Sequence, residues 1–136
     1  MYKFSFRKFE KTDVLFFDDF EINLNKKIKT LHFHKLKKII FLRYLFLAIL
    51  FFFKSLLFFK IINIKKVYFE NMVKEINPKI AVGSDFGEKI FLFKKLLPQK
   101  ISIAFQYSFV FHRRKKDYIN MLKNKKVDYF FVFNRN

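Results

Sequence analysis

Acidic and small polar residues follow three apolar stretches of the chain, and their types and spacing suit ligand binding. The stretches are residues 13–18 (DVLFFD), 79–84 (KIAVGS) and 100–106 (KISIAFQ). If each stretch is a strand of a parallel sheet, their carboxyl ends lie at one edge, where open α/β sheets bind ligands. The predicted ligand-binding residues at this edge are Asp18, Asp19, Gly83, Ser84, Asp85, Gln106 and Tyr107.

The segment 83–87 (GSDFG) connects a predicted strand to a predicted helix. Its backbone N–H groups and the Ser84 hydroxyl could bind an anion, as phosphate-binding turns do. It is neither a G-x-G-x-x-G motif nor a P-loop, however, and Asp85 would repel a phosphate. An ordinary turn with Ser84 or Asp85 as the helix N-cap is the preferred interpretation of the segment.

A metal site is not predicted. His32 and His34 would share one face of a strand, but no third ligand lies near them in the sequence. The acids Asp18, Asp19 and Glu21 could hold a cation, but turn chemistry explains them as well. With no Cys in the chain there is no thiolate ligand, disulfide or catalytic thiol, and no catalytic residue is identified.

The elements that position these residues alternate along the chain. From residue 66 onward the expected order is helix 66–76, strand 79–84, helix 88–97, strand 100–106, basic helix 113–125 and strand 127–133. Prolines at 78 and 98 end the first two helices. Strands are also expected at 13–18 and 27–34, and residues 1–11 are an edge strand or a lead-in. This alternation predicts an α/β fold with a mostly parallel sheet.

The stretch 37–59 (KKIIFLRYLFLAILFFFKSLLFF) has the length of a membrane span, but Arg43 and Lys54 interrupt it. On one continuous helix, Arg43, Lys54 and Lys65 would form a thin polar stripe. We therefore expect a long, mostly buried helix packed on the sheet. The alternative is a small basic protein anchored in a membrane by a helix at 39–59.

Net charge is +18, and its distribution is uneven: residues 22–69 hold eleven cations and no anion. Lys, Phe, Ile, Asn and Tyr, all encoded by A+T-rich codons, make up 77 of the 136 residues, so an A+T-rich genome explains part of the charge. A basic nucleic-acid-binding module is a further alternative. The basic block could also face an anionic membrane surface, and the candidate contact residues are Lys35, Lys37, Lys38, Arg43, Lys54, Arg113 and Arg114. A buried helix with solvated lysines at its ends explains the same block at least as well.

Several of these stretches carry a family resemblance. They are 13–18 (DVLFFD), 77–80 (NPKI) before a strand that leads to Asp85, 91–98 (FLFKKLLP), a strand ending in Gln106, and 127–134 (VDYFFVFN). With them the chain resembles, over most of residues 12–134, the N-terminal half of bacterial surface carbohydrate biosynthesis proteins. These are GT-B-like glycosyltransferases distantly similar to CDP-glycerol glycerophosphotransferases. Tyr107 and Ser108 depart from the pattern, in which Asn or His and then Gly follow the Gln.

The resemblance implies a Rossmann-like domain at 12–136 after a lead-in at 1–11, as a single incomplete GT-B-type half. In such enzymes a second, C-terminal domain binds most of the nucleotide-sugar donor, and by the resemblance we expect these 136 residues to lack it. The resemblance therefore implies an acceptor-side fragment, without a cofactor of its own and inactive alone. The implied partners are the C-terminal domain and a saccharide or lipid-linked acceptor, at the cytoplasmic face of the membrane.

Overall fold

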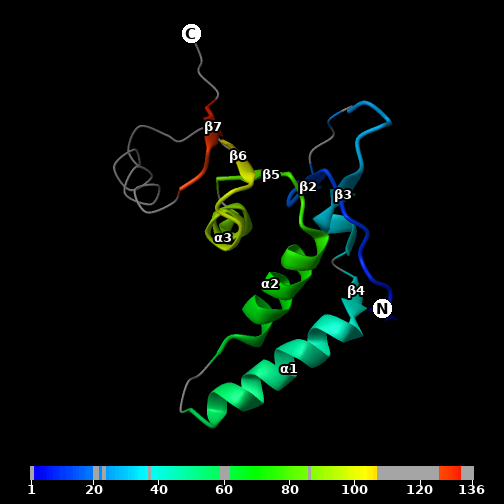
Figure 1. The fold of residues 1–136 in the computed structure, drawn as a ribbon. Coiled ribbons are helices and arrows are strands. Elements are labelled where there is room, and N and C mark those ends of the chain that lie inside the picture. Colours follow the sequence, from blue (N-terminus) through cyan, green and yellow to red (C-terminus); the bar gives the residue numbers. More distant parts are fainter. Residues whose placement is uncertain are drawn as a thin grey trace.

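The computed structural model describes residues 2–19, 22, 24–36, 38–58, 62–85, 87–106 and 126–132. A five-stranded parallel sheet forms its centre, with the strands in the order β3-β2-β5-β6-β7 (Figure 1). The strands are β2 (Val14–Phe16), β3 (Thr30–His32), β5 (Ile80–Ser84), β6 (Ile101–Phe105) and β7 (Tyr129–Phe131). The predicted fold class, α/β with a mostly parallel sheet, is confirmed.

The order of the strands creates a switch point in the sheet. From β2 the chain goes to β3 on one side, then returns to β5 on the other side of β2. Counted along the chain, the five strands thus have the order 2-1-3-4-5 of doubly wound sheets, which bind ligands where the order reverses. Val14 pairs with Ile80 and Phe16 with Val82, so β2 and β5 end next to each other.

Local signals explain where α2 (Ile64–Ile76) begins and ends. The side chain of its N-cap residue, Asn63, accepts a hydrogen bond from the Lys66 N–H at 3.3 Å. At the other end Asn77 has φ 45° and ψ 54°, the left-handed conformation that closes many helices, directly before Pro78. Proline favours an extended residue before it, and Asn77 departs from this because asparagine tolerates the left-handed region.

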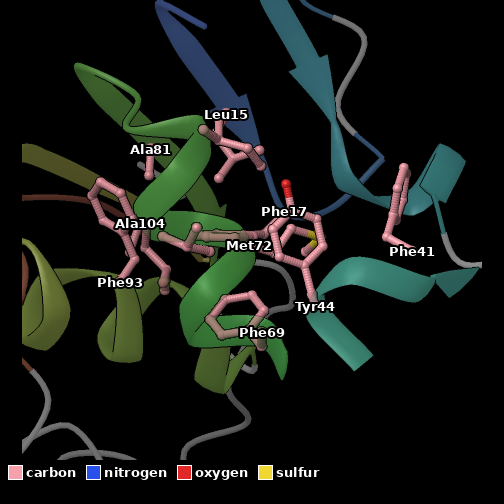
Figure 2. Packing of buried hydrophobic residues seen from close by; sticks show 12 residues of the cluster. Leu15, Phe17, Phe41, Tyr44, Phe69, Met72, Ala81, Phe93 and Ala104 are labelled. Carbon is pink, nitrogen blue, oxygen red and sulfur yellow. The ribbon is translucent and has the colours of Figure 1, made fainter. Parts of the chain in front are cut away.

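Helices α2 and α3 (Glu88–Leu96) supply one side of the main core. Figure 2 shows Phe17 and Met72 near its centre, with Leu15, Ala81 and Ala104 projecting from three neighbouring strands. Phe17 contacts the rings of Phe69 and Phe93, with centroids 5.7 and 6.1 Å apart. A smaller hydrophobic cluster on the opposite face of the sheet contains the buried residues Val14, Phe16 and Val82.

The stretch 37–59 is not one helix, and this expectation was wrong. Residues 39–41 form strand β4 (Ile39–Phe41), which pairs in parallel with β1 (Lys3–Ser5) in a separate two-stranded sheet. Residues 1–11 were expected to be an edge strand or a lead-in, and the structure shows a strand at residues 3–5. A short 3₁₀ helix, η1 (Phe33–Leu36), lies between β3 and β4.

Helix α1 (Leu42–Leu56) follows β4 and packs against α2 rather than on the sheet (Figure 1). The prediction of a mostly buried helix on the sheet was wrong, because only Tyr44, Ala48 and Ser55 of α1 are buried. Lys65 lies in α2, so it cannot continue a stripe with Arg43 and Lys54. Within the described part of the chain, no helix has the length and apolar character needed to cross a membrane.

Candidate ligand-binding site at the carboxyl edge of the sheet

Asp18 and Ser84 meet at the switch point between β2 and β5. The Ser84 N–H donates a hydrogen bond to the Asp18 carboxylate, with 2.6 Å between nitrogen and Oδ2. Nearby, the Phe17 N–H donates to the Val82 carbonyl at 2.9 Å, which extends the β2–β5 pairing by one residue. Asp18 is therefore fixed at the edge where the strand order reverses.

Gly83 in β5 and Gly87 before α3 lie beside this carboxylate, and only at Gly83 would a Cβ make a tight contact. A Cβ on Gly83 would lie 3.0 Å from the Ile90 Cβ and 3.6 Å from Asp18 Oδ2. A Cβ on Gly87 would lie 3.4 Å from the Ser84 carbonyl oxygen and 3.6 Å from the same Asp18 oxygen. The turn closes with a hydrogen bond from the Gly87 N–H to the Ser84 carbonyl at 3.1 Å.

The helix after this turn begins differently from the prediction. The N-cap of α3 is Gly87, not Ser84 or Asp85, and no side chain caps it. Strand β5 extends through Ser84, whose N–H is bound by Asp18. The chain's own carboxylate thus occupies an N–H that the phosphate-binding interpretation would assign to a ligand.

The remaining predicted residues lie along the same edge. Asp85 is fully buried, and its N–H donates to the Phe105 carbonyl at 3.0 Å. Gln106 is also buried, and its N–H donates to the Phe131 carbonyl at 2.9 Å. The edge therefore continues from β5 through β6 to β7. Tyr107 lies outside the described residues.

The second acid, Asp19, pairs with a histidine. Its Oδ1 lies 3.1 Å from His34 Nε2, and the His32 ring stacks on Phe16 with 4.8 Å between centroids. Burial, followed by the nearby Lys35 and His34, lowers the pKa of His32. Among the residues that the structure describes, no group of three His, Cys, Asp or Glu side chains could hold a metal ion.

The described basic residues that were assigned to a membrane surface are spread over η1, the start of β4 and α1. Lys35 belongs to η1, Lys38 immediately precedes β4, and Lys54 lies in the last turn of α1. Arg43, in the first turn of α1, pairs with Glu75 of α2 at 3.4 Å. Lys37, Arg113 and Arg114 lie outside the described residues, as does the predicted helix 113–125.

Two polar clusters at the opposite edge of the sheet were not predicted from the sequence. Lys94 Nζ contacts Asp128 Oδ1 and Oδ2 at 2.6 and 2.8 Å, and the Ser102 N–H and hydroxyl donate to Asp128 Oδ2. At the start of β2, Asp13 accepts from the Lys29 N–H and pairs with Lys79 at 2.8 Å. Hydrogen bonds from Lys79 and Lys29 lower the pKa of Asp13. An acid at the edge of an apolar strand was the available signal, but its partners are distant in sequence.

Comparison of the sequence with models of known protein families, with curated proteins and with solved structures gives no match.

Proposed function

We propose that this chain is the acceptor-side, Rossmann-like domain of a glycosyltransferase-like protein that builds cell-surface polysaccharide. The observation that carries the proposal is the Asp18 carboxylate, fixed by Ser84 at the switch point of the parallel sheet. Doubly wound sheets bind their ligands at this position. The resemblance described above supplies the class of reaction.

The charge at the switch point favours a neutral, hydroxyl-rich ligand over a phosphate. Asp18 provides a carboxylate there, and Asp85 directly follows β5. A carboxylate accepts hydrogen bonds from hydroxyl groups and repels phosphate oxygens. A saccharide acceptor therefore suits this edge better than a nucleotide diphosphate does.

Asp18 has the role of the acceptor-binding residue in this proposal. Its Oδ2 accepts a hydrogen bond from the Ser84 N–H, which fixes the carboxylate, and the proposal assigns Oδ1 to accept from a sugar hydroxyl. The nucleotide-sugar donor would be bound by a second domain, as in the enzymes that the chain resembles. These 136 residues would then bind an acceptor without transferring sugar to it.

Calorimetric titration with neutral oligosaccharides and with uridine diphosphate tests this function. The wild type should bind a saccharide but not the nucleotide, and Asp18→Asn should weaken saccharide binding at least tenfold. Asp13→Asn is the matched control, because Asp13 is the acid at the other end of the same strand. Equal saccharide affinity of wild type and Asp18→Asn, or binding of the nucleotide alone, would contradict the proposal.

A further inference from the structure

Helix α1 has apolar side chains on two opposite faces, and only one of them is covered. Tyr44, Ala48 and Ser55 are buried and share one face of the helix. Phe46, Leu50, Phe53 and Leu57 follow the spacing i, i+4, i+7, i+11, which places them within about 60° of one another on the opposite face. Leu57 directly follows the helix and keeps its conformation.

These four side chains are strongly exposed. The exposed fractions are 63% for Phe46, 49% for Leu50, 61% for Phe53 and 79% for Leu57. We call these four residues the outer stripe of α1. Contiguous exposed apolar patches on a protein surface mark sites of interaction with proteins or membranes, so a partner that covers the outer stripe is expected.

Strand β1 extends the apolar surface beyond the helix. Tyr2, Phe4 and Phe6 alternate along the chain, and all three are exposed. Phe6 and Phe46 line one groove of about 570 Å³, together with other residues from the first half of α1. The outer stripe therefore meets the N-terminal segment at Phe6.

Charge identifies what covers this surface. The sequence from residue 22 to 69 has eleven cations and no anion, and it contains the whole of α1. Around the helix axis, Arg43 and Lys54 fall next to the outer stripe, and Arg43 is partly neutralised by Glu75. A second copy of this chain, with its own net charge of +18, would be repelled, whereas an anionic bilayer is complementary.

We propose that α1 lies in the surface of an anionic lipid bilayer, with its axis along the membrane plane. The outer stripe enters the boundary between headgroups and acyl chains, and the flanking cations contact lipid phosphates. With fifteen residues α1 is shorter than the roughly 20 residues that cross a bilayer, which is compatible with a position along the membrane plane. This inference goes beyond the proposed function and does not depend on it, since it involves no residue of the switch point.

Vesicle co-sedimentation tests the proposal. The full chain should bind vesicles of phosphatidylcholine and phosphatidylglycerol in a 7:3 ratio much more strongly than pure phosphatidylcholine, and added salt should weaken the binding. The double variant Phe46→Ser/Phe53→Ser should bind the mixed vesicles at least tenfold more weakly. The matched control is Phe131→Ser/Val132→Ser, which removes two exposed apolar residues from β7 and its end and should bind like the wild type.

A single introduced cysteine gives a second, site-specific measurement, because the chain has none. An environment-sensitive fluorophore on Phe53→Cys should shift to the blue when mixed vesicles are added, and one on Val132→Cys should not. Equal vesicle binding by the stripe variant and wild type would overturn the proposal. A wild-type dimer that becomes monomeric on Phe46→Ser/Phe53→Ser substitution, without vesicle binding, would overturn it in favour of self-association.

Discussion

The Asp18 carboxylate accepts a hydrogen bond from the Ser84 N–H, with 2.6 Å between Oδ2 and nitrogen. This bond joins residues 66 positions apart and connects the carboxyl ends of the two strands that flank the switch point. It gives Asp18 a structural role that can be measured separately from ligand binding.

Removing the Asp18 side chain should destabilise the fold. Asp18→Ala leaves the Ser84 N–H, which is partly buried, without its charged acceptor, and we expect a loss of about 1.5–3 kcal/mol in unfolding free energy. Asp19→Ala is the matched control, because the Asp19 side chain is 76% exposed. It should cost less than about 0.5 kcal/mol. Urea denaturation measures both, and equal losses would show that the Asp18–Ser84 bond contributes nothing.

Substitution by alanine should change stability differently at Gly83 in β5 and at Gly87, the N-cap of α3. In Gly83→Ala the new Cβ would lie 3.0 Å from the Ile90 Cβ, which is held by the backbone of α3, so about 1–3 kcal/mol should be lost. In Gly87→Ala the nearest atoms lie at 3.4 Å and φ is −79°, so the Cβ fits. The smaller freedom of the unfolded chain then offsets the poor N-cap preference of alanine, and stability should change by less than about 1 kcal/mol. Thermal unfolding of the two variants measures the difference. A larger loss of stability in Gly87→Ala than in Gly83→Ala would contradict the geometry described for these two positions.

The contacts of Asp128 with Lys94 and Ser102 should make the free energy of unfolding depend on pH in the acidic range. Burial opposes the effect, but hydrogen bonds from Lys94 and Ser102 hold the pKa of Asp128 below its usual value. The ionised Asp128 therefore stabilises the fold fully above its pKa in the unfolded chain, about 3.9. This stabilisation is lost as the pH falls through the lower pKa of the folded state. Asp128→Asn should cost about 1–2 kcal/mol at pH 7 and progressively less as the pH is lowered below 4. A cost that stays constant down to pH 2 would contradict this account.

Tyr44 should produce the opposite dependence at alkaline pH. Burial, with a smaller effect of the Glu75 carboxylate, raises the pKa of Tyr44 to about 12. Because the folded pKa exceeds the unfolded value of about 10, the stabilisation is full below pH 10 and is lost as the pH rises towards 12. Tyr44→Phe should therefore match the wild type at pH 8 and become the more stable of the two above pH 10. Parallel stability curves for the two proteins would contradict a raised pKa.

Much of the fold could be predicted because its signals are local. Continuous apolar runs and the residues that end them located β2, β5 and β6, and Pro98 marked the end of α3. The alternation of these strands with helices was sufficient to predict a parallel sheet. The candidate edge followed from the sheet, since the carboxyl ends of parallel strands must lie together.

What could not be predicted depends on partners far away in the sequence. Strand β4 exists because residues 39–41 pair with β1, more than thirty positions earlier. Helix α1 is apolar on both its buried and its exposed face, so its hydrophobic pattern cannot show which side packs on α2. For the same reason the contact between Lys94 and Asp128, 34 residues apart, left no local signal.

The site chemistry was predictable in kind but not in geometry. The sequence indicated Asp18 and Ser84 as neighbours on one edge, yet not that Asp18 would bind the Ser84 N–H. That bond depends on the register of β2 against β5. The sequences of two continuously apolar strands do not determine their register.

The most direct test of the central claim is an NMR titration of backbone amides with a neutral oligosaccharide that binds the chain. If the switch point holds the acceptor, the largest shifts should occur at Asp18, Ser84 and Gly87, and they should disappear in Asp18→Asn while remaining in Asp13→Asn. Saccharide-induced shifts confined to other parts of the molecule, or shifts at these amides that survive Asp18→Asn, would contradict it.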